Sequence, residues 1–162
     1  MKEFRKGWVD GMLMRPANLW DAWALYSWRN DPGVRQYFEN TAKNNFVKHL
    51  IWFVRFLSNN KAIMFFFESK DIGRCGMTRL NESVGFPYYE ISILVDPKLH
   101  SKGIGKKILA MTMDVAPRFT EKLGVLARVN QSNTSSKKIF LQQGFKQISS
   151  DNFYLYLLFE SN

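Results

Sequence analysis

Metal-binding and disulfide-forming residues are scarce in this sequence. Its 162 residues include one cysteine, Cys75, and two histidines, His49 and His100. One cysteine excludes an internal disulfide framework and a four-cysteine zinc site. Two histidines are too few for a histidine-rich metal site, so we expect no metal. A lone thiol stays reduced in the cytosol, and we therefore expect a cytoplasmic location.

Long apolar runs are also absent. The strongest runs, Ala62–Phe67 and Tyr154–Phe159, have the length of core strands, whereas a membrane-spanning helix needs about 20 mostly apolar residues. Residues 1–11 are charged and lack the apolar region of a signal peptide. We therefore expect no secretion signal, no membrane span and no membrane partner.

Acidic residues are outnumbered, with 14 Asp and Glu against 23 Lys and Arg, which gives a net charge of +9. Such a balance points to anionic partners, namely nucleic acid, a membrane surface or phosphorylated small molecules. The lysines are dispersed, and no basic run interleaves with aromatic residues. A phosphorylated small molecule therefore fits better than nucleic acid, which we do not expect as a partner.

The sequence contains enough apolar residues, 46%, for one sizeable core, and its length suits a single domain over residues 1–162. Hydrophobic periodicity and turn residues predict strands and helices in a mixed order. The expected strands are Met12–Met14, Ala62–Glu68, Ile72–Leu80, Tyr88–Val95, Val125–Val129, Phe145–Ile148 and Phe153–Phe159. The expected helices are Leu19–Trp28, Asn45–Leu57, Gly103–Val115 and Asn133–Gln143. This order predicts an α+β domain around one largely antiparallel sheet.

The most informative stretch runs from Val95 to Lys107, where a strand ends, a short loop turns and a helix opens with Gly103 and Gly105. The N–H groups at a helix start lack intrahelical partners and carry the positive end of the helix dipole. Glycines let an anion approach the main chain, and a pyrophosphate fits that description. An ordinary glycine turn with solvated lysines is the alternative, because short glycine motifs are weak signals.

This stretch resembles the acetyl-CoA pyrophosphate loop of the GNAT superfamily of N-acetyltransferases, which reads Arg/Gln-x-x-Gly-x-Gly/Ala after a strand ending Val-x-Pro. The matching residues are Val95, Pro97, Gly103 and Gly105, and His100 stands where Arg or Gln is usual. Downstream, residues 133–145 are similar to the superfamily's Asn-x-x-Ala-x-x-Leu-Tyr-x-x-x-Gly-Phe. The two motifs occur in the right order, and the element order matches over nearly the whole chain.

The resemblance implies a GNAT-like α+β (mixed α/β) fold, with a twisted, mostly antiparallel sheet of six to seven strands flanked by about four helices. It implies acetyl-CoA as cofactor, with the pantetheine arm lying between the strands Tyr88–Val95 and Val125–Val129. The implied cofactor-binding residues are Ile93, Leu94, Val95, His100, Ser101, Lys102, Gly103, Ile104, Gly105, Lys106, Asn130, Asn133, Ser136 and Phe140. The main chain of Ile93 and Val95 would bond the pantetheine arm. Asn133 has an alternative role as the N-cap of the helix that follows it.

Phe140 departs from the family pattern, because many members carry there a Tyr whose hydroxyl protonates the leaving thiolate. A thiol with a pKa near 8.5 is a tolerable leaving group, so loss of this acid is survivable. Water or another tyrosine could supply the proton, and the sequence does not choose among Tyr88, Tyr89, Tyr154 and Tyr156.

The N-terminal third carries a narrower likeness. Residues 14–16, 28–32 and 49–53 resemble the nucleotide-sugar branch, whose members N-acetylate a UDP-linked 4-amino sugar for pseudaminic or related nonulosonic acids. Ribosomal-protein N-terminal acetyltransferases share a similar Trp-Arg start, and in both groups the first two helices build the acceptor site. The candidate substrate-binding residues are Arg29, Asn30, Arg35 and Arg79. Arginines suit a diphosphate because they make forked contacts to phosphate, and solvated arginines are the alternative.

Acetyl transfer needs a neutral amine, so a base or a water chain must remove a proton. Glu90 is the first candidate, since it shares a strand face with Ser92 and is costly there unless partnered. Its alternatives are an ion pair with a base such as Arg79, or substrate binding alone. His49 is the second catalytic candidate because its ordinary pKa suits base work, and helix packing is its alternative.

These patterns predict an acetyl-CoA-dependent N-acetyltransferase that works by direct transfer in a ternary complex. The expected acceptor is the amine of a nucleotide-linked amino sugar of the UDP-4-amino-4,6-dideoxy type. One rival is a ribosomal-protein or peptide N-terminal acetyltransferase. A second rival is a catalytically silent acyl-CoA-binding module, which Phe140 and His100 keep open. A homodimer also stays open.

Overall fold

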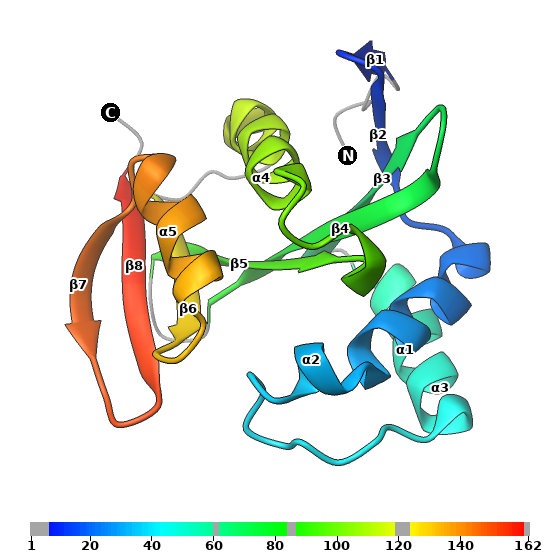
Figure 1. The fold of residues 1–162 in the computed structure, drawn as a ribbon, viewed down its shortest axis with the longest axis horizontal. Coiled ribbons are helices and arrows are strands. Elements are labelled where there is room, and N and C mark those ends of the chain that lie inside the picture. The colour runs from blue at the N-terminus through cyan, green and yellow to red at the C-terminus, as the bar shows by residue number, and fades with distance from the viewer. Residues whose placement is uncertain (1–6, 60–61, 84–86, 119–123, 161–162) are drawn as a thin grey trace.

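One eight-stranded sheet with helices on both faces organises the computed structural model, which describes residues 7–59, 62–83, 87–118 and 124–160 (Figure 1). The strands are β1 (Gly7–Val9), β2 (Met12–Pro16), β3 (Ala62–Ser69), β4 (Gly73–Glu82), β5 (Tyr88–Val95), β6 (Gly124–Asn130), β7 (Lys146–Ser150) and β8 (Tyr154–Glu160). The helices are α1 (Ala22–Asn30), α2 (Pro32–Arg35), α3 (Phe46–Leu57), α4 (Ile104–Val115) and α5 (Thr134–Gln142), with short 3-10 turns η1 (Leu19–Asp21), η2 (Pro97–Leu99) and η3 (Ala116–Arg118). None of these helices is long and apolar enough to cross a membrane.

The strands lie in the order β1-β2-β3-β4-β5-β6-β8-β7. Among these described strands only β5 and β6 run parallel, and every other neighbouring pair is antiparallel. The predicted α+β class and mostly antiparallel sheet are therefore confirmed. The parallel pair is possible because the chain between β5 and β6 crosses over through α4.

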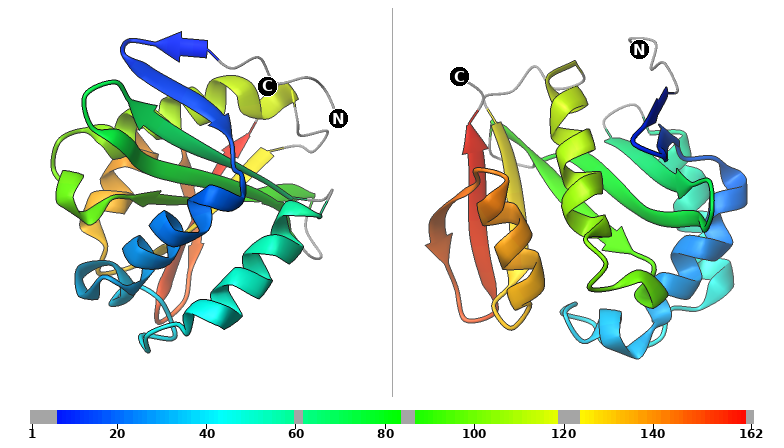
Figure 2. Two further views of the ribbon diagram at one scale, coloured as in Figure 1. Left: turned by 90° about the vertical axis from the view of Figure 1, so that its right-hand side faces the viewer. Right: turned by 45° about the horizontal axis from the view of Figure 1, so that its top comes forward.

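Strand β3 shows why the sheet is covered on both sides. Its run Met64–Phe67 is fully apolar and buried, and successive side chains point to opposite faces of a strand. Phe65 and Phe67 join a cluster that includes Ile108 of α4. Met64 and Phe66 instead pack with residues of α1 and α3. Figure 2 shows these two helical layers on opposite faces of the sheet.

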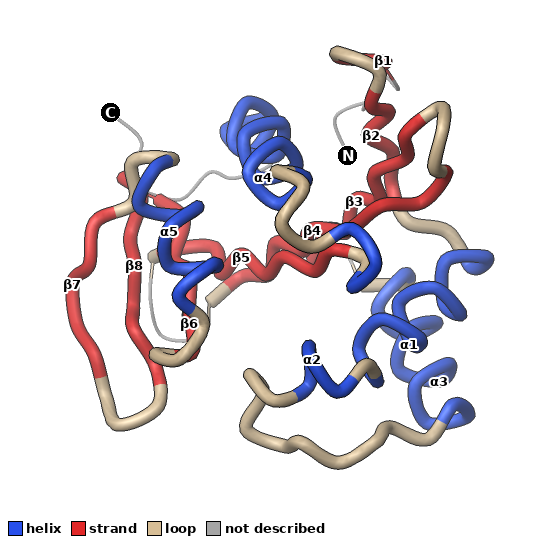
Figure 3. Tube along the Cα trace, viewed as in Figure 1, coloured by secondary structure: helices blue, strands red, loops and turns tan. Residues whose placement is uncertain are grey.

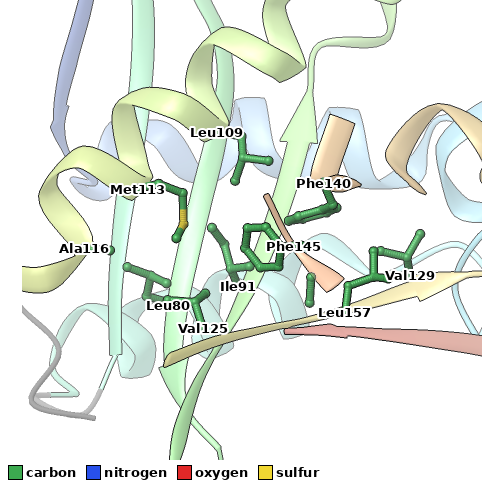
Figure 4. Close-up of a cluster of buried hydrophobic side chains, with 11 residues drawn as sticks. Leu80, Ile91, Leu109, Met113, Ala116, Val125, Val129, Phe140, Phe145 and Leu157 are labelled. Carbon is green, nitrogen blue, oxygen red and sulfur yellow. The ribbon is translucent and has the colours of Figure 1, made fainter. Parts of the chain in front are cut away.

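Helix α4 sits close against the sheet because the strand beneath it carries a glycine. A Cβ built on Gly76 of β4 would lie 3.0 Å from Ile108 Cδ1 and 2.9 Å from a neighbouring strand carbonyl. One turn further along, Thr112 Oγ1 donates to the Ile108 carbonyl at 2.8 Å, so Thr78 of β4 donates to Thr112 at 2.8 Å. Beyond this contact lies the cluster that joins α4 and α5 to β5, β6 and β8 (Figure 4).

A buried ion pair ties the first helical layer to the sheet. Arg15 of β2 donates to both oxygens of Asp21 at 2.7 Å, and its Nη2 lies 2.6 Å from Glu68 of β3. Arg74 of β4 adds a third contact to Asp21 at 2.8 Å. Burial raises the pKa of Asp21, but the hydrogen bonds from Arg15 and its neighbours lower it below the ordinary range. This network holds η1 and therefore the start of α1 against the sheet.

Two elements of the described chain, β1 and α2, were not predicted; Figure 3 shows where they lie. The described residues therefore form eight strands rather than six or seven, and five α-helices rather than about four. Strand β1 has three residues, which is too short for an alternating pattern to appear in the sequence. Helix α2 has four residues and begins at Pro32, after the N-cap Asp31. Proline ends one helix and also favours the first position of the next, so this turn signal has two meanings.

Candidate active site

Strands β5 and β6 are hydrogen-bonded over only part of their length and then diverge. They pair from Tyr88 and Gly124 to Ile91 and Ala127. Beyond this point β5 continues to Val95 alongside β4, and β6 continues to Asn130 alongside β8. Figure 1 shows the two strands diverging. The divergence leaves two strand edges facing a gap in the middle of the sheet.

The edge of β5 at this gap is formed by alternate residues. The Asp96 N–H donates to the Cys75 carbonyl of β4 at 3.0 Å, and main-chain groups of successive strand residues point to opposite edges. The N–H and C=O groups of Val95 and Ile93 therefore face the gap, and no described strand pairs with them. The main-chain groups of Leu94 point toward β4 instead, and its side chain packs with the cluster that contains residues of α1.

Unpaired amides line the turn into α4. Gly103 is the N-cap with φ of 75°, and Ser101 has φ of 63°. Within the described part of the chain, the main-chain N–H groups from Ser101 to Lys106, including Lys102 and Ile104, donate to no protein group. A Cβ on Gly105 would lie 3.3 Å from Ile139 Cδ1 of α5, so this glycine lets the two helices meet beside β5. The turn has the donors that a pyrophosphate requires.

The opposite wall of the gap comes from β6 and α5. Asn133 caps α5 by accepting from the Ser136 N–H at 3.0 Å, so the predicted capping role is confirmed. Asn130 accepts from the Ser132 N–H and hydroxyl at 3.0 and 2.7 Å. Phe140 is buried, and its ring packs edge-on against Phe145 with centroids 5.0 Å apart (Figure 4). Contacts of Asn130, Asn133, Ser136 and Phe140 with a cofactor stay predictions.

Glu90 lies on β5 one residue before the strands separate, on the face that α1 covers. Its carboxylate lies 3.9 Å from Arg128 Nε, and Arg128 also reaches Glu39 of the α2–α3 loop at 3.5 Å. The partner within ion-pair distance is therefore Arg128, which was not predicted, while the predicted example, Arg79, is influenced by the charge of Glu90. Alternation could have found Arg128, because Val125, Ala127 and Val129 face the opposite core.

Two further arginines crowd the same face. Arg79 of β4 donates to Ser92 at 3.4 Å, while its Nε is buried without a hydrogen-bond partner in the described structure. Arg29 of α1 lies over the Phe38 ring, 4.2 Å from its centroid. Burial lowers the pKa of both guanidinium groups; the charge of Arg29 lowers the pKa of Arg79 further, and the charge of Glu90 opposes that shift. Two partly buried positive charges therefore lie close enough to repel each other.

Arg35 and Asn30 shape the loop between α2 and α3. Arg35 Nη1 donates to the Thr41 carbonyl at 2.9 Å, and Asn30 exchanges hydrogen bonds with the main chain of Asn44 at 2.8 and 3.4 Å. Arg35 Nε is also buried without a partner within the described residues. Figure 3 shows this loop running between the two helices. Both residues hold the loop, and a contact with substrate stays a prediction.

His49 lies in the interface between α1 and α3. Its ring is buried, donates through Nε2 to the Ala22 carbonyl at 3.0 Å, and stacks on Phe53. Burial lowers the pKa of His49, and the bond to Ala22 partly opposes that shift. The structure therefore shows the helix-packing role that was the alternative to catalysis. Tyr156, a candidate acid, donates its hydroxyl to Asp151 at 2.7 Å.

A family model described as "Acetyltransferase (GNAT) domain" matches residues 12–146, a span that includes the divergent strands and the turn into α4. The chain belongs to this GNAT family. It is thus an acetyl-CoA-dependent N-acetyltransferase. No curated protein matches its sequence. The open edge of β5 and the unpaired amides at α4 fit acetyl-CoA, which supplies an acetyl group activated as a thioester.

Solved structures share the fold of this GNAT protein at low identity. A domain from Methanocaldococcus jannaschii superposes with a TM-score of 0.80 at 18% identity, covering 93% of this chain and 98% of that one. Spermidine N-acetyltransferase from Vibrio cholerae, solved with CoA and spermine, gives 0.77 at 14% identity, covering 93% and 95%. YncA from Salmonella typhimurium, solved with acetyl-CoA, gives 0.73 at 19% identity, covering 92% and 93%.

Proposed function

We propose that the acceptor is the amine of a nucleotide-linked amino sugar of the UDP-4-amino-4,6-dideoxy type, acetylated directly in a ternary complex. The pair Arg29 and Arg79 carries this proposal. Their guanidinium groups repel each other, and the Arg79 Nε has no partner among the described residues. A diphosphate would relieve the repulsion and accept forked hydrogen bonds from arginine.

The same charges argue against a polyamine acceptor. The Vibrio cholerae enzyme is named for spermidine and was solved with spermine, and such molecules carry several positive charges. Arg29 and Arg79 would repel them in the acceptor face, and Glu90 and Glu39 are shared with Arg128. Peptide N-terminal acetylation requires no diphosphate site, so it leaves the two arginines without a function in binding.

Glu90 is the base in this proposal. Its side chain is one-third exposed and stands where the gap between β5 and β6 opens. The carboxylate accepts a proton from the acceptor ammonium, which leaves the neutral amine that acyl transfer requires. Arg128 orients the carboxylate from the adjacent strand. Phe140 offers no proton, so we assign protonation of the leaving thiolate to water.

The acceptor is tested by thiol release with three amines, namely a UDP-4-amino sugar, spermidine and a short peptide. We expect turnover of the sugar nucleotide and competitive inhibition of that reaction by UDP. Arg79→Ala should raise the acceptor KM roughly 10- to 100-fold, because a hydrogen bond to a charged group contributes about 1.5–3 kcal/mol. Arg55→Ala on α3, an exposed arginine, is the matched control and should change KM little.

Two results would contradict the proposal in different ways. Turnover of spermidine or peptide that UDP does not inhibit would overturn the sugar-nucleotide acceptor while preserving the acetyltransferase. Tight CoA binding with no turnover of any amine would favour the silent binding module. An unchanged acceptor KM in Arg79→Ala would remove the arginine pair from recognition.

A further inference from the structure

The His100 side chain makes a hydrogen bond to a main-chain carbonyl at the open edge of β5. His100 follows Leu99, a buried residue that packs with Ile108 and so fixes the turn between β5 and α4. The imidazole folds back along the strand, and its Nε2 lies 3.3 Å from the Val95 carbonyl oxygen. A carbonyl only accepts, so the ring nitrogen is the donor.

The Val95 carbonyl belongs to the open edge of β5. Strand-edge carbonyls that lose their neighbouring strand need another hydrogen-bond donor. Among the described residues, the imidazole of His100 is the group that donates a hydrogen bond to the Val95 oxygen. The ring therefore performs, in the protein alone, the role that a paired strand or an extended ligand would perform.

The turn needs such support because its backbone is unfavourable. Ser101, directly after His100, has φ of 63°, a left-handed conformation that residues with a Cβ seldom adopt. On its N-terminal side the turn is held by the buried Leu99, by main-chain hydrogen bonds from Leu99 to Asp96 and from His100 to Pro97, and by the bond from the His100 ring to Val95. Of these contacts, the ring bond is the one made to the open edge of β5, so its release frees the Val95 carbonyl.

We propose that the His100 ring takes the place of a pantetheine amide: it donates a hydrogen bond to the Val95 carbonyl in the free protein, and this bond breaks when acetyl-CoA binds. His100 is thus a positioning residue that competes with the cofactor for one acceptor. The inference rests on the assigned cofactor and is independent of the acceptor amine. It also gives a role to the one position where the loop departs from the family's Arg or Gln.

The chain has two histidines, so ¹⁵N-histidine NMR reports on this bond directly. At pH 8, added CoA should shift the His100 Nε2 resonance, while His49, bonded to Ala22 in the helix interface, should not move. His100→Ala identifies the signal. CoA binding by calorimetry with an unchanged His100 resonance would overturn this inference alone. Absence of CoA binding would overturn the cofactor assignment with it.

A binding measurement with pantetheine itself, which lacks the pyrophosphate, isolates the competition. His100→Ala should bind pantetheine about two- to tenfold more tightly than the wild type, since loss of one hydrogen bond of ordinary strength corresponds to such a factor. His100→Gln restores a side-chain N–H donor and should return the affinity toward the wild-type value. Unchanged or weaker pantetheine binding by His100→Ala would overturn the proposal.

Discussion

Glu90 and Arg128 meet across the last paired residues of β5 and β6, 3.9 Å apart. Arg128 lies within ion-pair distance of two carboxylates, because Glu39 also approaches it from the α2–α3 loop. At the scale of single residues, the face of the sheet proposed to bind the acceptor therefore carries Arg29, Arg79 and Arg128, and both nearby carboxylates pair with Arg128. Removing either carboxylate leaves the other pair in place, which makes the two comparable as substitution sites.

Glu90→Gln should lower kcat by about 100-fold or more across the pH range, because general-base catalysis typically contributes 10²–10⁴-fold. CoA affinity should persist, since the amides at α4 are untouched. Steady-state kinetics and calorimetry provide the two readouts. Glu39→Gln removes the other partner of Arg128 and is the matched control. Equal kcat values for wild type and Glu90→Gln would remove Glu90 from the mechanism.

At the scale of elements, helix α5 begins at a residue with one observed role and one predicted role. Asn133 Oδ1 is engaged with the Ser136 N–H, which satisfies one of the free donors at the helix start. Its amide nitrogen is a separate group, and the family resemblance assigns Asn133 a contact with the cofactor. A substitution that keeps the cap but removes the amide separates these roles.

Asn133→Ser should preserve stability, because serine caps helices about as well as asparagine, whereas Asn133→Ala should lose about 1 kcal/mol. Both variants should bind CoA more weakly if the amide contacts it, as we expect. Urea unfolding and calorimetry measure the two effects. Wild-type CoA affinity in Asn133→Ser would reduce Asn133 to a helix cap.

At the scale of the whole molecule, the described residues form one sheet between two helical layers, and the layer of α1–α3 has a buried histidine and a buried ion pair at its boundaries. His49 joins α1 to α3, and Asp21 with Arg15 joins η1 to β2. Both arrangements favour one protonation state in the folded chain. The pH dependence of stability therefore reports on the layer formed by α1–α3.

Burial holds the pKa of His49 below its ordinary value of 6.5, so the unfolded chain binds this proton more readily than the fold does. Stability therefore falls as the pH drops through and below 6.5. Asp21, with a pKa lowered from 3.8, contributes fully above that value and loses its contribution below it. The melting temperature should thus be lower at pH 5.5 than at 7.5.

Thermal unfolding followed by circular dichroism checks this pH effect. His49→Gln keeps an N–H donor for the Ala22 carbonyl and should show a smaller difference between pH 5.5 and 7.5 than the wild type. His100→Gln changes the exposed histidine and should retain the wild-type difference. An unchanged difference in His49→Gln would contradict the assignment.

The sequence predicted the elements wherever the local pattern was long enough. The apolar run of β3 and the periodic stripe of α3 gave strands and helices close to their observed bounds. The paired glycines after Val95 predicted the turn whose amides remain unpaired. Short elements escaped prediction, because β1 and α2 have too few residues to display a period.

Residue type and spacing thus determined the order of the longer elements and the glycine turn before α4, and the motifs in two of these segments carried the resemblance to the family, because such features depend on near neighbours in the chain. Tertiary structure decided which side chains meet. Arg128 reaches Glu90, Arg79 lies near Arg29, and His49 turns into a helix interface. The partners in these contacts lie at least 20 residues apart in the sequence. Only the folded sheet and its helices bring them together.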